Sequence, residues 1–250
     1  MKFGILGALP QEVALIKRSM TVRRSVTIGT RVFHEGEWGG RQIVLALARV
    51  GKVSAALTTA LLLERFGVGR VIFTGVAGAL DSRLRPGDVV IADRLLHHDM
   101  DSRPLFPRFE VPLLGRSVFE ASLADVAEAA ARAYTEGSRA AEIPAEWRAV
   151  LGNATPSVWR GLVLSGDQFI GGAERVAALR ALQPEALCVE MEGAAVAQVC
   201  HEMGGVPAAI IRVISDRADG SAAADFQRFV KDIAEWLIGG ILLVMLERGV

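Results

Sequence analysis

Short apolar runs rich in β-branched residues recur along the chain, and they limit its fold more than any other feature. Each run has the length of a strand, and several are followed by a helical pattern. Runs without polar alternation are typical of strands that are covered on both faces, as in α/β proteins. The predicted strands are KFGIL, QIVLALA, RVIFTG, VVIAD, LVLSGD, ALCVEM and AAIIRVIS.

Helical patterns lie between these runs. Pro10 suits the first turn of a helix after the first run, because its fixed φ matches that position. Gly51 precedes an Ala/Leu-rich helix that ends near Phe66, and residues 192–203 form another helical pattern. This alternation predicts an α/β fold with a mainly parallel sheet. The length of 250 residues suits one domain of that class, over residues 1–250.

The charge balance excludes some classes of partner. Lysine plus arginine equal aspartate plus glutamate at 28 each, so no net field draws the chain to a polyanion. We therefore expect neither nucleic acid nor a membrane as a partner. Residues 236–246 are strongly apolar but fall short of the ~20 residues of a membrane span, which favours a buried helix.

Cysteine usage and the first residues indicate the compartment. Cys188 and Cys200 form neither a CxxC motif nor a cluster with histidines, which is typical of reduced thiols in a cytosolic protein. The opening apolar run meets Pro10 and Glu12 too soon for the core of a signal peptide. We expect a cytoplasmic protein.

Polar residues at the ends of the predicted strands are the natural candidates for a site. In open α/β sheets, ligands bind beyond the carboxyl ends of the strands. Four carboxylates occupy such positions: Glu12, Glu190, Glu192 and Asp216. One carboxyl can activate water while another, with its pKa raised by its surroundings, delivers a proton to a leaving group.

Two segments lack periodicity. Residues 99–114 hold three prolines, which predicts a long irregular loop of the kind that forms lids or contacts. Residues 137–157 mix Pro, Gly, Asn and Ser, which indicates a surface excursion or partial disorder.

Sequence blocks in a fixed order connect the chain to a known family. Together they resemble the bacterial 5′-methylthioadenosine/S-adenosylhomocysteine nucleosidases, within the nucleoside phosphorylase and nucleosidase superfamily. The resemblance spans nearly the whole chain and implies one α/β domain around a distorted, mostly parallel central sheet flanked by helices. The blocks are GILGALPQEV, RVGKVSAA, FTGVAGAL followed by RPGDVVIAD, SGDQFI, VEMEGAAVAQVC and IRVISDRAD.

The resemblance implies a role for each matching residue. Glu12 positions and deprotonates the attacking water, and Arg212 helps to hold that site. Asp216 hydrogen-bonds the purine N7 and supplies its proton while the ribose passes through an oxocarbenium-like state. Glu192 binds the ribose hydroxyls. The other implied substrate-binding residues are Met191 under the sugar, Phe169 stacked on the base, the backbone of Ile170 at the base edge, Val50, Leu9 and Phe226 on the apolar side, and Val76, Ser215 and Glu190.

The resemblance also implies an oligomeric state and a reaction without a cofactor or metal. We expect a homodimer in which Leu105 or Phe106 reaches across the interface to the neighbour's pocket. We expect no cofactor and no metal, because proton transfer and electrostatic stabilisation suffice for this reaction class.

Taken singly, each site residue has an ordinary structural explanation. Glu12 lies in a predicted first helical turn, where the helix dipole alone favours a carboxylate. Asp216 suits a cap after a strand, and Glu190 suits a structural role more than a catalytic one. Phe169 and Met191 are of types that more often belong to the core.

The sequence also departs from the family's pattern. Val76 stands where many of these nucleosidases have a serine near the attacking water, and Pro10 and Gln11 replace common acidic residues. These changes, with the altered 99–114 loop, concern the part of the chain that the resemblance connects with the choice of substrate.

Four rival functions stay open at this point. A phosphorylase of the same fold uses phosphate, yet a carboxylate at Glu12 repels phosphate and no arginine occurs in FTGVAGA. Futalosine hydrolase and AMP nucleosidase are hydrolases of the same fold, and the second needs a basic 5′-phosphate pocket, for which Arg103 and Arg108 are candidates. A protein that only binds nucleosides is the alternative of another class.

Overall fold

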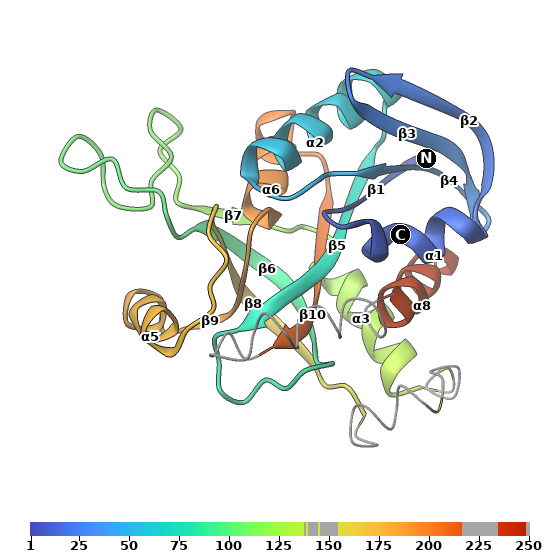
Figure 1. Cartoon of the computed structure of the whole chain (residues 1–250). Coiled ribbons are helices and arrows are strands. Elements are labelled where there is room, and N and C mark those ends of the chain that lie inside the picture. The colour runs from blue at the N-terminus through green and yellow to red at the C-terminus, as the bar shows by residue number, and fades with distance from the viewer. Residues whose placement is uncertain (138, 140–144, 146–154, 217–234, 249–250) are drawn as a thin grey trace.

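The computed structural model describes residues 1–137, 139, 145, 155–216 and 235–248 (Figure 1). Its strands belong to one mixed sheet. They are β1 (Phe3–Gly7), β2 (Thr21–Ile28), β3 (Arg31–Trp38), β4 (Arg41–Leu47), β5 (Arg70–Ala79), β6 (Val89–His97), β7 (Val118–Glu120), β8 (Val158–Ser165), β9 (Ala186–Glu190) and β10 (Ala208–Asp216).

The sheet closes on itself at one end and stays open at the other. Its order is β10-β6-β8-β9-β5-β1-β4-β3-β2, with β7 beside β6 and a second pairing between β10 and β5. Because of that second pairing, β5, β10, β6, β8 and β9 form a closed ring. Strands β1, β4, β3 and β2 continue from β5 as an open wing.

Two parallel sections make up the middle of this sheet. Strands β4, β1, β5 and β10 are mutually parallel neighbours, and so are β6, β8 and β9. The sections meet antiparallel, and β5 and β9 pair only near their carboxyl ends, with Gly78 opposite Val189 and Ala79 opposite Cys188. The carboxyl ends of both sections therefore converge. The predicted α/β class with a distorted sheet is confirmed.

Helices cover both faces of the sheet (Figure 1). Helices α1, α3 and α8 share one apolar core, whereas α2 and α6 contribute to a second core on the other face. Helix α5 lies at the periphery and buries only Leu179. The helix bounds are α1 (Pro10–Ser19), α2 (Lys52–Phe66), α3 (Ala124–Thr135), α5 (Ala173–Leu182), α6 (Gly193–Glu202) and α8 (Glu235–Glu247).

The apolar segment at residues 236–246 forms helix α8, as predicted. Its side chains pack into the core between α1 and α3, and Leu237, Ile241 and Leu242 are fully buried. Across the described ranges, every helix falls short of the length and apolar character that crossing a membrane requires.

The proline-rich segment is an irregular loop, as predicted. Residues 98–117, between β6 and β7, project away from the sheet (Figure 1). The loop exposes two leucines, Leu105 at 82% and Leu113 at 94%. Most of the 137–157 stretch lies outside the described residues.

Candidate active site

A cavity of about 230 Å³ opens where the carboxyl ends of the strands converge. It receives residues from the ends of β1, β5, β9 and β10 and from the loops after β4 and β8. None of the described residues that line it is a lysine or an arginine. The lining residues are Ala8, Leu9, Glu12, Val50, Val76, Ala77, Gly78, Gln168, Phe169, Ile170, Val189, Glu190, Met191, Glu192 and Asp216.

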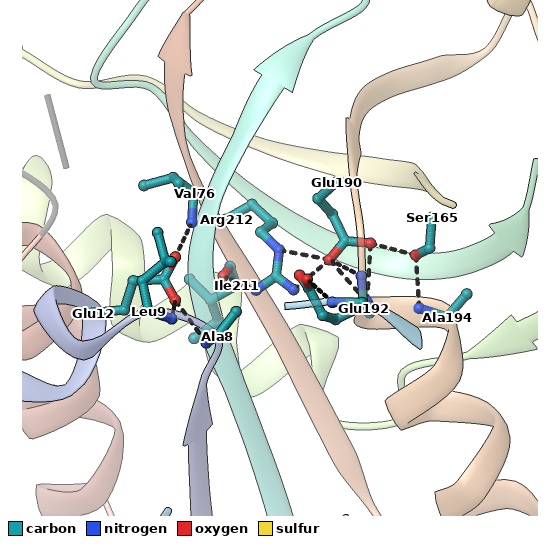
Figure 2. A network of polar contacts seen from close by, with 12 residues as sticks. Ala8, Leu9, Glu12, Val76, Ser165, Glu190, Glu192, Ala194, Ile211 and Arg212 are labelled. Atoms are coloured by element: carbon teal, nitrogen blue, oxygen red, sulfur yellow. Dashed lines mark hydrogen bonds and ion pairs between the residues drawn. The ribbon is translucent and has the colours of Figure 1, made fainter. Parts of the chain in front are cut away.

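Glu12 is held in this cavity by backbone amides. It lies in the first turn of α1, where its Oε2 accepts the N–H groups of Ala8 (2.7 Å) and Leu9 (2.8 Å). Its Oε1 accepts the N–H of Val76 at 3.1 Å (Figure 2). A Cβ at Gly75 would lie 2.6 Å from that same oxygen, so glycine is required for the carboxylate to approach β5 this closely.

The surroundings of Glu12 favour a base with a higher pKa than that of an ordinary glutamate. Its side chain is buried, and within the described part of the chain it forms no ion pair. Burial raises the pKa of the Glu12 carboxyl, and the three amides and the charge of Arg212 offset only part of that effect. A carboxylate with a raised pKa and amides that fix its orientation can take a proton from a bound water.

A buried ion pair connects the cavity wall at Glu190 to Arg212 behind it. Arg212 on β10 donates from Nη2 (2.6 Å) and Nε (3.2 Å) to Oε2 of Glu190 at the end of β9. The guanidinium also lies over the ring of Phe73, 4.1 Å from its centroid. Figure 2 shows Arg212 between the Glu12 group and the Glu190 group. Its positive charge therefore compensates the carboxylates from behind the cavity wall.

Glu190 fixes the turn that leads into α6. Its carboxylate accepts the N–H groups of Glu192 (3.1 Å) and Gly193 (2.8 Å). The hydroxyl of Ser165 also donates to Glu190, and it accepts the N–H of Ala194 at 2.8 Å (Figure 2). With these partners Glu190 has the structural role that the sequence favoured, although part of it reaches the cavity.

Glu192 precedes α6 as its N-cap and faces the cavity. Its Oε1 accepts the N–H of Gly51 at 2.8 Å, and Gly51 has a φ of 96°, which other residues rarely adopt. Burial, followed by the negative charge of Glu190, raises the pKa of Glu192 to about 8. This carboxyl therefore exchanges its proton in the neutral range.

Asp216 ends β10 and is 2% exposed. The hydroxyl of Ser215 donates to its Oδ2 at 2.6 Å and lies 3.3 Å from the carbonyl oxygen of Ala77. Ser215 is itself buried and is not a lining residue, so its contact with the site runs through Asp216.

A network of hydrogen bonds between charged residues at the rim of the cavity connects three segments that are distant in sequence. Lys52, at the start of α2, donates from Nζ to Asp99 at 2.5 Å. Asp99 also accepts the N–H of Asp167 at 2.9 Å, and Asp167 accepts the N–H of Lys52 at 2.8 Å. These bonds fix the loop of Gln168 and Phe169 against the start of α2.

The structure brings most of the predicted site residues together. Arg212 and Ser215 lie just behind the cavity wall, and Phe226 lies outside the described residues. Gln168 also lines the cavity and was not a predicted site residue, although it lies in a segment that follows a predicted strand. The predicted residues that line the cavity are Glu12, Asp216, Glu192, Glu190, Met191, Phe169, Ile170, Val50, Leu9 and Val76.

Candidate metal ligands do not gather in the same way. Within the described ranges, no group of three or more His, Cys, Asp or Glu side chains is arranged to hold a metal ion. Cys188 and Cys200 are free and buried.

Comparison with known proteins identifies the family of the chain. The model of the phosphorylase superfamily matches residues 2–241. A 5′-methylthioadenosine/S-adenosylhomocysteine nucleosidase from Actinobacillus succinogenes is 36% identical and aligns over 96% of this chain and 97% of its own. The chain belongs to this nucleosidase family. A relative of the same name from a Marinomonas species is 38% identical over 93% of each chain. The protein is accordingly a nucleosidase, an N-glycosyl hydrolase.

Solved structures of this family have the same fold. The nucleosidase of Neisseria meningitidis, in complex with methylthio-immucillin-A, superposes with a TM-score of 0.86 at 34% identity and covers 99% of both chains. A futalosine hydrolase of Helicobacter pylori also superposes, with a TM-score of 0.82 at 32% identity over 99% of this chain and 98% of its own. Chains of this fold therefore carry at least two substrate specificities.

Proposed function

We propose that the protein hydrolyses the N-glycosidic bond of 5′-methylthioadenosine and S-adenosylhomocysteine, releasing adenine and the thioribose product. The observation that carries this proposal is the Glu12 carboxylate, which is buried, fixed by three amides and placed in one cavity with Asp216. The names of the aligned relatives support the choice of substrates.

The two carboxyl groups divide the chemistry between them. Glu12 takes a proton from a water molecule, whose oxygen then bonds to the anomeric carbon of the ribose. Asp216 gives a proton to N7 of the purine as the bond between sugar and base breaks, so the base leaves as neutral adenine. The charge that develops on the sugar is oxocarbenium-like and is stabilised by nearby carboxylates. Arg212, paired with Glu190, balances the negative charge of this site from behind.

The remaining lining residues suit a nucleoside. Glu192 binds the ribose hydroxyls, and its proton exchange in the neutral range lets it accept or donate a hydrogen bond. Met191 packs under the sugar. Phe169 is half-exposed and stacks on the base, a contact worth ~1–3 kcal/mol in comparable complexes. The backbone of Ile170 binds the base edge, while Val50 and Leu9 line the apolar 5′ end.

The charge of the cavity argues against phosphorolysis. Phosphate requires arginine, lysine or an array of free amides. The described lining residues include no such cation, and the amides nearest the nucleophile already bind Glu12. The charge of the cavity also argues against binding of a 5′-phosphate. Arg103 pairs with Asp101, and neither Arg103 nor Arg108 lines the cavity.

Futalosine hydrolysis is the second candidate. It is favoured by the futalosine hydrolase fold match, and Val76 departs from the serine expected near the water. The Val76 N–H nevertheless binds Glu12, so Glu12 can act as the base that activates water with either substrate.

Chromatographic detection of the free base tests the proposal. The purified chain is incubated with methylthioadenosine, S-adenosylhomocysteine, futalosine, AMP and inosine, each with and without phosphate. We expect phosphate-independent release of adenine from the first two. Release that requires phosphate contradicts hydrolysis, and release only from futalosine assigns the chain to the second candidate.

We infer a homodimer and a cytoplasmic location as part of the same proposal, and we assign the reaction to methionine salvage. The exposed Leu105 and Leu113 on the projecting loop support the dimer, as do Val53 (79% exposed) and Leu57 (47%) on the outer face of α2 beside the cavity. The two free cysteines support a reducing compartment. The single domain over residues 1–250 stays a prediction of the sequence.

A further inference from the structure

A second cavity, of about 250 Å³, lies on the other side of α1 from the candidate active site. Pro10, Val13 and Lys17 form one of its walls, because their spacing places them on one face of α1. The opposite wall comes from β3 and β4 and from the loop after β4. The residues of this groove, which we call the basic groove, are Pro10, Val13, Lys17, Thr30, Arg31, Val32, His34, Leu45, Ala46, Leu47 and Arg49.

The charged residues that line the basic groove are all of the basic type. Four of its residues are basic, namely Lys17, Arg31, His34 and Arg49, and its described lining contains no aspartate or glutamate. The whole chain has a formal net charge of zero, so this concentration is local.

Neutral groups, not carboxylates, bind the two arginines of the groove. Arg31 donates from Nε to the hydroxyl of Thr58 at 2.7 Å, and Arg49 donates to the carbonyl oxygen of Thr30 at 2.5 Å. Within the described part of the chain, neither arginine nor Lys17 forms an ion pair. Their positive charges are therefore available to an anion.

Arg49 adds an independent observation. Its φ is 66°, in the left-handed region that a residue with a side chain adopts at a cost of about 1 kcal/mol or more. Backbone outliers of this kind concentrate at sites with a function. Glycine would be the relaxed residue here, yet the position carries a cation at the mouth of a basic cavity.

Titration directions agree with an uncompensated positive field. Burial lowers the pKa of His34, and the charge of Lys17 lowers it further. Burial likewise lowers the pKa of Arg31, with Arg49 as the second cause. On the neighbouring strand face, Glu35 binds Lys2 and Arg24 and does not line the groove.

We propose that the basic groove is a binding site for a phosphoryl group, carried by free phosphate or by a small phosphate ester, separate from the nucleoside cavity. A phosphoryl group has the charge to match three cations, and its several oxygens can accept from two guanidinium groups and an ammonium at once. A monocarboxylate has half that charge and fewer acceptors.

Isothermal titration calorimetry of the full chain at constant ionic strength tests the site. The probes are inorganic phosphate, ribose 5-phosphate and acetate. We expect saturable binding of both phosphates and at least ~tenfold weaker binding of acetate, which corresponds to ~1.4 kcal/mol. Tighter binding of ribose 5-phosphate than of phosphate identifies an ester as the ligand, and the reverse identifies the free ion. Equal binding of acetate, or no saturation, overturns the proposal.

Arg49→Gly is the most informative variant, because it removes the cation and relaxes the backbone. We expect at least ~tenfold weaker phosphate binding with a thermal midpoint that does not fall. Arg49→Lys should retain most of the affinity, and Lys17→Gln should lose affinity as Arg49→Gly does. Arg65→Gln is the matched control, since Arg65 is an exposed arginine at the other end of α2. Wild-type affinity in both Arg49→Gly and Lys17→Gln would overturn the site.

Hydrogen exchange locates the bound phosphate without relying on activity. We expect protection in peptides that cover residues 29–34 and 47–49. Protection confined to residues 74–79 and 188–193 places the phosphate in the nucleoside cavity and contradicts the proposal.

Discussion

At the scale of single residues, the site contains two buried glutamates whose pKa values are both raised, chiefly by burial. Desolvation dominates for Glu12, and amides hold it from three sides. Glu192 shares a wall with Glu190, so repulsion between carboxylates adds to desolvation. The first environment orients a base, and the second keeps a proton available at neutral pH.

Asp216→Asn removes the proposed proton donor and keeps the shape of the side chain. We expect nucleoside binding to persist while kcat falls by ~10²–10⁴-fold, the usual contribution of a general acid. Steady-state kinetics with a separate measurement of ligand binding checks this. Unchanged turnover would remove Asp216 from the acid role.

Glu12 must be ionised to act as a base, and its pKa is raised above 4.5. Activity should therefore fall as the pH drops through that raised pKa, and the acidic limb of kcat/KM should lie above the range of an ordinary glutamate. Glu12→Gln should fold and lose turnover. A pH–rate profile for the wild type and circular dichroism for the variant test both points, and near-normal activity of the variant contradicts the assignment.

The protonation of Glu192 affects the free energy of unfolding of the protein. Its folded pKa of about 8 exceeds the unfolded value of 4.5, so the native state binds the additional proton between these pH values. Stability from this group is therefore present at pH 4.5 and below and is lost as the pH rises through 8. Glu192→Gln should flatten the dependence of the unfolding free energy on pH between 5 and 8. Urea unfolding at several pH values measures it, and an unaltered slope refutes the link.

At the scale of elements, buried strands were predictable and exposed ones were not. β1, β5, β9 and β10 are apolar runs, and their buried faces leave a plain sequence signal. β2 and β3 were missed because β2 is largely exposed and cross-strand charge pairs such as Arg24 with Glu35 replace apolar alternation. The turn at Gly29 and Thr30 was the sequence signal that could have revealed the hairpin of β2 and β3.

The positions of the site carboxylates were predictable from the sequence, but the long-range pairs that they form were not. Carboxylates at strand ends were found because position along the chain determines which end of a sheet they occupy. The partners of those carboxylates were not, since nothing local connects Arg212 to Glu190 or Lys52 to Asp99. These pairings depend on how the two parallel sections meet.

Gly75 tests the contact between β5 and α1. In Gly75→Ala the new Cβ would lie 2.6 Å from Oε1 of Glu12 and displace the carboxylate. We expect kcat to fall by ~10²-fold or more, because a misplaced base loses most of its contribution. Gly172→Ala is the control, since nothing lies within 4 Å of its Cβ and the activity should be retained. Equal activities of the two variants would show that Glu12 tolerates displacement.

At the scale of the whole molecule, exposed apolar groups gather around the cavity's rim and on the projecting loop. Val50, Val53 and Leu57 are exposed on or beside α2, and Leu105 and Leu113 are exposed on the loop. Such groups mark interaction surfaces when they cluster. A second copy of the chain would cover them and narrow the mouth of the cavity.

Leu105→Asp combined with Leu113→Asp tests that assembly. Burying two new charges in an interface is unfavourable, so we expect the dimer to dissociate and KM to rise. Light scattering after size exclusion measures the mass. Leu182→Asp is the control, because Leu182 is an exposed leucine (39%) on the peripheral helix α5. A wild-type monomer, or a double variant that stays dimeric, contradicts the interface.

The pairing of β5 with strands from distant parts of the chain imposes an order on folding. β5 pairs with β1, near the start of the chain, and with β10, the last described strand. Contacts between such distant segments make folding slow, and during synthesis most of one edge of β5 stays unpaired until β10 leaves the ribosome. An unpaired edge is a template for association with other chains, so the nascent chain is most vulnerable just before it becomes an enzyme.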